Sequence, residues 1–185
     1  TIVDAALHVL ATQGARGLTH RSVDQHANVP MGTCSNYFRN KHALYVAMGD
    51  RIFERLTPPP KDRAESATAP PSVERFQELM HELMDRVRAQ PALQLALLEL
   101  RLEATRRPEL REGLVRTLSS ALSIDLEFHA QAGLPGGRRE LVLLHLGIGG
   151  LILNLVTMPE VLGLDDPHEI LDDLVRRILD GSERA

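Results

Sequence analysis

Side chains that can bind phosphate oxygens and base edges are concentrated between residues 19 and 41. This segment carries hydroxyl, amide, guanidinium and ammonium groups among small and apolar residues. Hydroxyl and ammonium groups bind the phosphates of a nucleic acid, whereas reading its sequence needs side chains that reach base edges. The candidates for these contacts are Thr19, Arg21, Met31, Gly32, Thr33, Ser35, Asn36, Tyr37 and Lys41.

Two short helices joined by a tight turn must hold these side chains. Thr19 is a good N-cap for the first of them, which is expected to reach about residue 26. Asn28 tolerates positive φ, so residues 27–29 are predicted to form the turn. Pro30 suits the first position of the second short helix, which should end near Tyr37.

This arrangement is typical of a helix-turn-helix motif, whose second helix enters the major groove of DNA. The positions where its helices cross need small or apolar side chains, and here they are Val23, Ala27, Val29 and Cys34. The outer face of the second helix needs polar or small side chains, and here they are Met31, Gly32, Ser35 and Asn36.

Residues 19–44 resemble the signature of the TetR family of transcriptional regulators. The resemblance covers about the first quarter of the chain. The matching positions are Thr19, Val23, Ala27, Val29, Gly32, Thr33, Tyr37, Phe38, Lys41 and Leu44. The segment departs from the family pattern at Asn28, Pro30, Cys34 and Ser35, so an operator sequence cannot be carried over from a relative.

The resemblance implies a ligand-responsive repressor that binds a pseudo-palindromic operator in double-stranded DNA as a homodimer. By the same resemblance, Arg21 would reach a base edge or a phosphate, while Met31, Gly32 and Ser35 would lie against bases. The residues that would mainly position the protein on phosphates are Thr19, Thr33, Asn36, Tyr37 and Lys41.

Composition favours an all-α fold. Apolar residues make up 43% of the 185-residue chain and aromatic residues only 3%, with almost no strand-like alternation. Residues 1–56, with a first helix that Gly14 can end and a fourth that Asn40 can cap, are expected to form a DNA-binding domain around a three-helix head. Residues 57–185 are expected to form an effector-binding and dimerisation bundle, which gives about nine helices in total. The bundle helices are predicted at residues 73–89, 91–106, 108–132, 137–158 and 167–180, after a proline-rich junction over residues 57–72.

Charge and cysteine content fit this interpretation without proving it. The net charge is −4, but residues 1–55 carry six Lys and Arg against four Asp and Glu. The single cysteine, Cys34, excludes an intramolecular disulfide framework and fits a reducing, cytoplasmic location. No signal peptide is visible, and because the chain begins at Thr1 rather than Met, we expect a short natural N-terminus to precede it.

The uncharged stretch over residues 141–158 is long enough to raise the alternative of a membrane helix. Because the rest of the chain is polar, we favour a helix buried partly in a core and partly against a second subunit, with no membrane partner. The resemblance implies that the last two helices of each subunit form the dimer interface. The expected interface residues are Leu146, Gly150, Leu153, Leu171, Leu174, Val175 and Ile178.

Polar residues within apolar stretches are the candidates for an effector pocket, which the resemblance places between the middle helices. They are Glu99, Arg101, His129, His145 and Asn154. The alternatives are an ion pair along the helix that holds Glu103 and Arg106, and hydrogen bonds inside the dimer interface. The abundance of leucine favours an apolar or amphipathic effector.

Enzymatic function is not expected, and neither a cofactor nor a catalytic residue is assigned. Glu78 and His81 have the Glu-x-x-His spacing of di-iron bundles, but no second such motif follows. No metal site is therefore expected. A helical interaction module that no longer binds DNA is a further alternative, which the presence of Arg21, Tyr37 and Lys41 disfavours.

Overall fold

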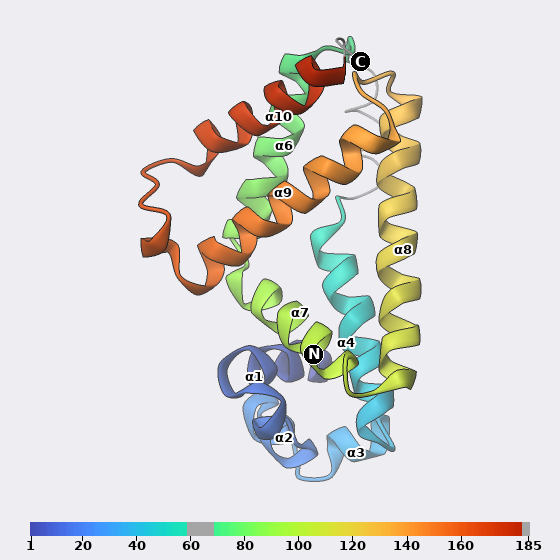
Figure 1. Ribbon diagram of the computed structural model, residues 1–185. Coiled ribbons are helices and arrows are strands. Elements are labelled where there is room, and N and C mark those ends of the chain that lie inside the picture. Colours follow the sequence, from blue (N-terminus) through green and yellow to red (C-terminus); the bar gives the residue numbers. More distant parts are fainter. Residues whose placement is uncertain (59–68, 183–185) are drawn as a thin grey trace. The chain divides into compact units, whose positions relative to one another are not determined.

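The computed structural model describes residues 1–58 and 69–182, with side chains up to residue 179. These residues form nine α-helices and one 3-10 turn, and they contain no strand, so the predicted all-α fold is confirmed (Figure 1). Most of the predicted proline-rich junction lies outside the described residues. The elements are α1 (Ile2–Gly17), α2 (His20–Ala27), α3 (Thr33–Tyr37), α4 (Lys41–Leu56), α6 (Val73–Arg88), α7 (Pro91–Ala104), α8 (Pro108–Gln131), α9 (Arg138–Thr157), η1 (Pro159–Val161) and α10 (Pro167–Ser182).

The helices form two compact units. The first unit comprises Thr1–Thr57 and Gln90–Ala121, and the second comprises the described residues of Pro58–Ala89 and Leu122–Ala185. The chain therefore returns to the first unit through α7 and the beginning of α8. The predicted division into a DNA-binding domain over residues 1–56 and an effector-binding domain over residues 57–185 is a division by function, and it stays a prediction.

In the first unit, α1 packs against α2, α4 and α7. Leu7 and Leu10 on α1 are almost fully buried, and each contributes about 1.5–3 kcal/mol relative to an exposed side chain. They belong to a core whose other members include Val9, Leu18, Val23, Cys34, Leu44, Tyr45, Met48, Ile52, Leu93, Ala96, Leu100 and Leu110.

Most predicted helix ends are confirmed. Gly14 adopts φ 66° and kinks α1, but the helix continues to Gly17, three residues beyond the predicted end at Gly14. The side chain of Asn40 accepts a 2.9 Å hydrogen bond from the backbone N–H of Ala43 and caps α4. α10 begins at Pro167, and the carboxylate of Asp166 accepts from the N–H of His168 at 2.9 Å. The starts of α4 and α10 depend on residues close in sequence, which is why the pattern alone locates them.

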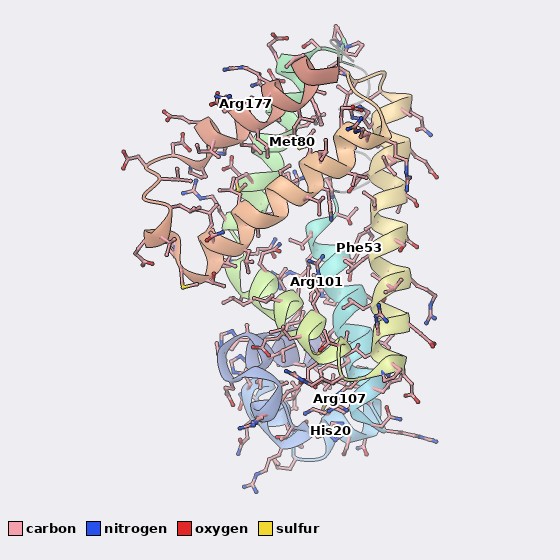
Figure 2. All side chains as sticks on the ribbon, viewed as in Figure 1. His20, Phe53, Met80, Arg101, Arg107 and Arg177 are labelled. Atoms are coloured by element: carbon pink, nitrogen blue, oxygen red, sulfur yellow. The ribbon has the colours of Figure 1, made fainter. Side chains whose placement is uncertain are left out.

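In the second unit, α10 packs against α6 and α9. Gly147 on α9 makes this possible, since a Cβ there would lie 2.7 Å from a methyl group of Leu174. The shared core includes Phe76, Met84, Leu134, Leu144, Ile148, Leu151, Leu171, Val175 and Leu179, and partly buried residues such as Met80 pack against it (Figure 2).

Only one face of α9 is buried in this unit. Leu144 and Ile148 enter the core, whereas Leu146 is 65% exposed and Leu153 is 44% exposed. By length and composition α9 could cross a membrane: it has 20 residues and a mean hydropathy of 1.8, and 17% of its most apolar window is buried. A large apolar face of this kind marks a surface that something else covers.

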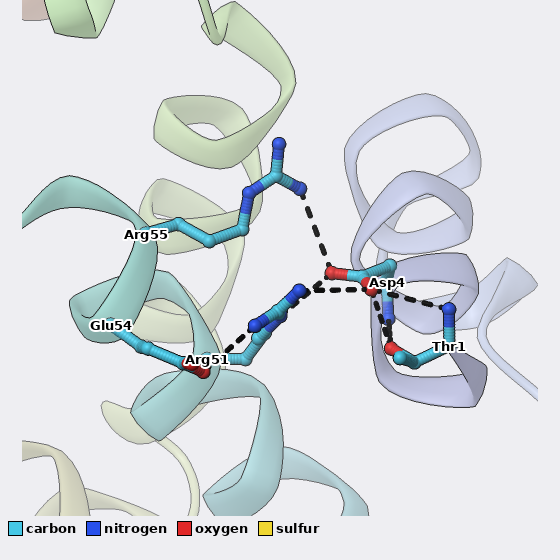
Figure 3. Close-up of polar contacts among 5 residues, drawn as sticks. All are labelled: Thr1, Asp4, Arg51, Glu54 and Arg55. Atoms are coloured by element: carbon cyan, nitrogen blue, oxygen red, sulfur yellow. Dashed lines mark hydrogen bonds and ion pairs between the residues drawn. The ribbon is translucent and has the colours of Figure 1, made fainter.

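An ion-pair network on Asp4 joins α1 to α4 (Figure 3). Arg51 donates from Nε to Asp4 Oδ1 at 2.9 Å and from Nη2 to Oδ2 at 3.3 Å. Arg51 also donates to Glu54 Oε2 at 2.8 Å, and Arg55 lies 3.6 Å from Asp4. The hydrogen bonds from Arg51 hold the pKa of the Asp4 carboxyl well below its usual range.

The substitution Asp4→Asn is expected to destabilise the protein by about 1 kcal/mol at neutral pH, as is usual for a partly exposed ion pair. Because folding depresses the pKa of Asp4, this contribution is fully present above the unfolded-state value of about 3.9 and is lost as the pH falls below it. Urea unfolding of the wild type and D4N between pH 3 and pH 7, read by circular dichroism, measures the difference.

A double-substitution cycle with Arg51→Gln supplies the control. If the pair acts as described, D4N/R51Q is less destabilised than the sum of the two single variants. Additive effects that do not change with pH would show that the contact contributes nothing to stability.

Candidate nucleic-acid interface

The turn between α2 and α3 has the geometry that the sequence predicts. The hydroxyl of Thr19 accepts a 3.0 Å hydrogen bond from the N–H of Ser22 and caps α2. Asn28 ends α2 in the left-handed conformation, with φ 52° and ψ 47°. The N–H of Val29 then donates to the carbonyl of Asp24 at 3.1 Å. A second helix with Cys34 in its buried position follows, so the helix-turn-helix arrangement is confirmed.

The predicted start of the second short helix of the motif, α3, is wrong. α3 begins at Thr33, not at Pro30, and Gly32 precedes it with φ 93°. Pro30 instead supplies a carbonyl to which both the N–H and the hydroxyl of Thr33 donate. The fixed φ of proline suits a turn as well as a helix start, and only glycine adopts the φ of residue 32 without strain. α3 is therefore only five residues long.

The outer surface around α3 is open to solvent. Met31 is 58% exposed and Tyr37 is 73% exposed, and both are large side chains that no core residue covers. Arg21, Ser35 and Asn36 are also exposed. With Thr19, which is exposed at the start of α2, these make six exposed residues among the nine predicted to contact DNA.

The hydroxyls of Thr19, Thr33 and Ser35 serve the protein backbone. Thr19 caps α2, Thr33 donates to the carbonyl of Pro30, and Ser35 donates to the carbonyl of Gly32 at 2.9 Å. The hydroxyls of Thr33 and Ser35 use their hydrogens in these bonds, so they can still accept a hydrogen bond but cannot donate one to a phosphate. The hydroxyl of Thr19 accepts in the cap, and its own hydrogen points to the hydroxyl of Ser22 at 3.0 Å. Their phosphate and base contacts stay a prediction, and the structure adds a local role for each.

Lys41 is held inside the first unit. Its ammonium donates to the carbonyl of Ala15 at 2.9 Å and lies 5.8 Å from the centre of the Tyr45 ring. Burial lowers the pKa of Lys41, and the nearby guanidinium of Arg107 lowers it further. Arg107, at the connection between α7 and α8 (Figure 2), also lies over the Tyr45 ring and donates to Glu103 at 2.9 Å. Lys41 thus joins α4 to the end of α1.

Sequence reasoning missed Asp24. This residue is 1% exposed, and its carboxylate accepts from the N–H groups of Gly32 and Cys34, each at 2.7 Å. The signal in the sequence was a charged residue beside Val23, on the side of α2 that crosses α3. Burial, to which the charge of Asp24 adds, raises the pKa of the Cys34 thiol to about 11.

The predicted effector residues do not form one cluster. In the first unit, Glu99 on α7 is half-buried against Gly14, and Arg101 is exposed (Figure 2). The expected ion pair along this helix is present between Glu103 and Arg106, at 3.6 Å.

In the second unit, His129 is 5% exposed. Its Nε2 lies 3.1 Å from the carbonyl of Gly136, its ring meets Phe76 edge-on at 5.1 Å, and its buried Nδ1 has no hydrogen-bond partner among the described residues. His145 is exposed, and Asn154 donates to the carbonyl of Gly150 on its own helix at 2.9 Å.

The expected dimer residues fall into two groups. Leu146, Gly150 and Leu153 are exposed on α9. On α10, Leu171 and Val175 are fully buried and Leu174 and Ile178 are half-buried. Leu171 and Val175 fill the core of the second unit. Because neither side chain has exposed surface, they support the core and not the dimer contact expected of them.

The Glu-x-x-His pair is engaged elsewhere. Glu78 accepts from Arg75 at 2.8 Å, and His81 Nε2 lies 2.8 Å from Asp172 Oδ1. Within the part of the chain that the structure describes, no group of three or more His, Cys, Asp or Glu could hold a metal ion. Glu78 and His81 therefore have structural partners in the second unit.

Two sequence families match the chain. The family described as "Bacterial regulatory proteins, tetR family" matches residues 2–48, and the family described as "Tetracyclin repressor-like, C-terminal domain" matches residues 71–181. A curated relative, an uncharacterised helix-turn-helix transcriptional regulator of Xanthobacter autotrophicus, is 43% identical over 54 residues. Those residues are 29% of this chain and span 27% of the relative's length.

Solved structures share the fold over nearly the whole chain. A transcriptional regulator from Rhodococcus sp. Rha1 is 18% identical, with a TM-score of 0.74 over 97% of this chain and 95% of the other. A transcriptional regulator from Streptomyces coelicolor A3(2) is 21% identical, with a TM-score of 0.68 over 96% and 95%. The multidrug binding protein EbrR, crystallised with proflavin, is 23% identical, with a TM-score of 0.60 over 96% of each chain.

Proposed function

Because the chain belongs to the TetR family of bacterial transcriptional regulators, we propose that it is a repressor that a small molecule releases from its DNA operator. The observation that carries the DNA-binding part is the exposed surface of α2 and α3. Arg21, Asn36 and Tyr37 are solvent-exposed there, on short helices that the core holds through Val23 and Cys34. We call α3 the recognition helix from here on.

The expected division of labour follows from the chemistry of the exposed groups. Arg21 supplies the guanidinium that pairs with a phosphate or with a guanine edge, and Asn36 supplies an amide for a base or a phosphate. Met31 presents an apolar surface of the kind that packs on a thymine methyl group. The net charge of +2 over residues 1–55 favours approach to DNA, although the whole chain is acidic.

Replacing Arg21 by Gln is expected to weaken operator binding by about tenfold, the effect of losing one charge-assisted contact. If Arg21 pairs with a phosphate, the slope of log affinity against log salt becomes less steep by about 1. An operator is first obtained by selection from random double-stranded DNA with the wild-type protein. Fluorescence anisotropy of that labelled operator, at four salt concentrations, then gives both quantities.

Lys41→Gln is the contrasting variant. Because the ammonium of Lys41 already donates to Ala15, K41Q should lower the free energy of unfolding by about 1 kcal/mol even without DNA. Failure of the wild type to select any sequence, or binding without salt dependence, would contradict the repressor proposal and favour an interaction module.

A homodimer is proposed through the exposed face of α9. Leu143, Leu146 and Leu153 present apolar surface there. At Gly149 and Gly150 an added Cβ would meet nothing within 4 Å, so the backbone of α9 is open to close approach by another helix. A two-fold dimer would place two recognition helices on one duplex, which requires a pseudo-palindromic operator.

The variant Leu146→Lys is expected to give a monomer, because it puts a charge into the middle of the proposed interface. Sedimentation velocity at micromolar concentration measures the mass. The matched control is Val115→Lys on α8, a residue of the first unit that is 52% exposed. The proposal is wrong if L146K remains dimeric, or if the wild type is monomeric and partitions into lipid vesicles.

The second unit is proposed to bind the effector. His129 supports this, since it is buried and its Nδ1 has no partner among the described residues, beside the aromatic ring of Phe76. EbrR has been crystallised with the aromatic dyes proflavin, ethidium and malachite green. An apolar or amphipathic molecule with one polar group that pairs with His129 is the class that we propose. Binding releases the operator only if the molecule prefers the DNA-free conformation.

Proflavin and ethidium, which both carry amino groups that can donate to Nδ1 of His129, are suitable probes, and either should raise the melting temperature of the DNA-free protein. The stabilisation reaches about 2.7 kcal/mol when the free ligand is at a hundred times its dissociation constant. His129→Phe should weaken dye affinity about tenfold by removing the polar partner. The matched control is His145→Phe on α9, where the histidine is exposed. Stabilisation by polar metabolites but by neither dye would contradict the proposed class.

As a repressor, the protein would catalyse no reaction and would act in the cytoplasm, where chromosomal DNA lies. The interactions of Glu78 with Arg75 and of His81 with Asp172 support the absence of a di-iron reaction. No cofactor is part of the proposed mechanism.

A further inference from the structure

Asp24 connects α2 to the recognition helix through its backbone carbonyl and through its side-chain carboxylate. Its backbone carbonyl accepts from the N–H of Val29 at 3.1 Å and so closes the turn. Its carboxylate reaches further along the chain. Oδ2 accepts from the N–H of Gly32 and Oδ1 from the N–H of Cys34, each at 2.7 Å. Because the carbonyl also accepts from the N–H of Asn28, Asp24 accepts from four backbone N–H groups of the segment that follows α2.

The recognition helix needs these contacts, because it has few of its own. The first four N–H groups of any helix lack an acceptor within the helix. In a helix of five residues they are most of the total, and Gly32 at the N-cap has no side chain that could accept from them. Asp24 acts as the missing cap from a neighbouring helix.

The carboxylate of Asp24 is buried, so backbone N–H groups take the place of the water that an exposed carboxylate would bind. Asp24 is 1% exposed and forms no ion pair among the described residues. A buried carboxylate without hydrogen-bond partners is strongly unfavourable. The two short hydrogen bonds from the N–H groups of Gly32 and Cys34 offset the loss of water around the carboxylate.

We propose that Asp24 is the positioning residue of the recognition helix, and that sequence-specific DNA binding depends on it although its side chain is shielded from solvent. This proposal rests on the DNA-binding function proposed above. The bonds to Gly32 and Cys34 fix the start of α3 relative to α2. Ser35, whose hydroxyl donates to Gly32, and the exposed Met31 follow that position.

Asp24→Asn is the sharpest substitution. The amide has the same shape, and its oxygen can still accept from one N–H group. Its NH2 group would face the second N–H, donor against donor, so one contact becomes repulsive. Asp50→Asn on α4 is the matched control, because it makes the same change of charge at an exposed position.

Hydrogen exchange of the wild-type protein without DNA tests the contacts directly. The amides of Gly32 and Cys34 should exchange at least about tenfold more slowly than the amide of Met31, which has no acceptor among the described residues. Equal exchange rates for the three amides would overturn the proposal. This measurement needs no variant and no operator, so it stands apart from the outcome of the DNA experiments.

The affinity of D24N for DNA tests the consequence. Specific affinity for the selected operator should fall between about tenfold and a hundredfold, the range for losing a hydrogen bond to a charged group. Affinity for random-sequence DNA should fall by no more than about threefold and the salt slope should change by less than about 1, because Arg21 on α2 keeps its place while the phosphate contacts of α3 are only disturbed. D50N should match the wild type in its specific affinity, its affinity for random-sequence DNA and its salt slope.

Other outcomes separate the proposals. An unchanged specific affinity in D24N overturns the positioning role, and so does an equal loss of specific and non-specific affinity, which would indicate a general loss of stability. If D24N does not fold, Asp24→Glu replaces it, and a shifted carboxylate should still lower the ratio of specific to non-specific affinity. A wild type that selects no operator ends the proposed function, while slow exchange at Gly32 and Cys34 would still support the contacts of Asp24.

Discussion

A five-residue helix cannot hold itself in place. Helix formation starts unfavourably, and a single turn gains too few internal hydrogen bonds to compensate for the loss of backbone freedom. The position of α3 therefore depends on what surrounds it. Cys34 buries its side chain in the core of the first unit, Asn28 turns the chain, and Asp24 accepts the N–H groups that the helix leaves open. The exposed side chains of α3 that are proposed to meet DNA depend on these three residues.

The rest of the first unit serves the same end. Asp4 and Arg51 join α1 to α4, and Lys41 joins α4 to the carbonyl of Ala15 near the end of α1. α7 then covers α1 with Leu93, Ala96 and Leu100. The helices that carry the DNA-facing residues are thus set into a larger core than residues 1–56 alone could form. The family match over residues 71–181 begins in the second unit, at α6, and includes α7 of the first unit.

Local features were predictable because their causes are local. A cap such as Thr19 or Asn40 acts within three residues, and a turn residue such as Asn28 acts on its own backbone. The start of α3 was not predictable in this way, because the deciding contact comes from Asp24, eight residues before Gly32. The three glycines of α9 show the same limit. Gly147 is needed against Leu174 within the chain, while Gly149 and Gly150 face open space, and nothing in their spacing distinguishes them.

The burial of Cys34 has a practical consequence. Only a thiolate reacts quickly with alkylating reagents, and this thiol has its pKa raised to about 11 and no exposed surface. In the folded protein the sulfur is therefore chemically inert. Because the chain has one cysteine, the rate at which a thiol reagent modifies the intact protein reports how often the region around α3 opens. The protein thus contains an intrinsic probe of the flexibility of its own recognition helix.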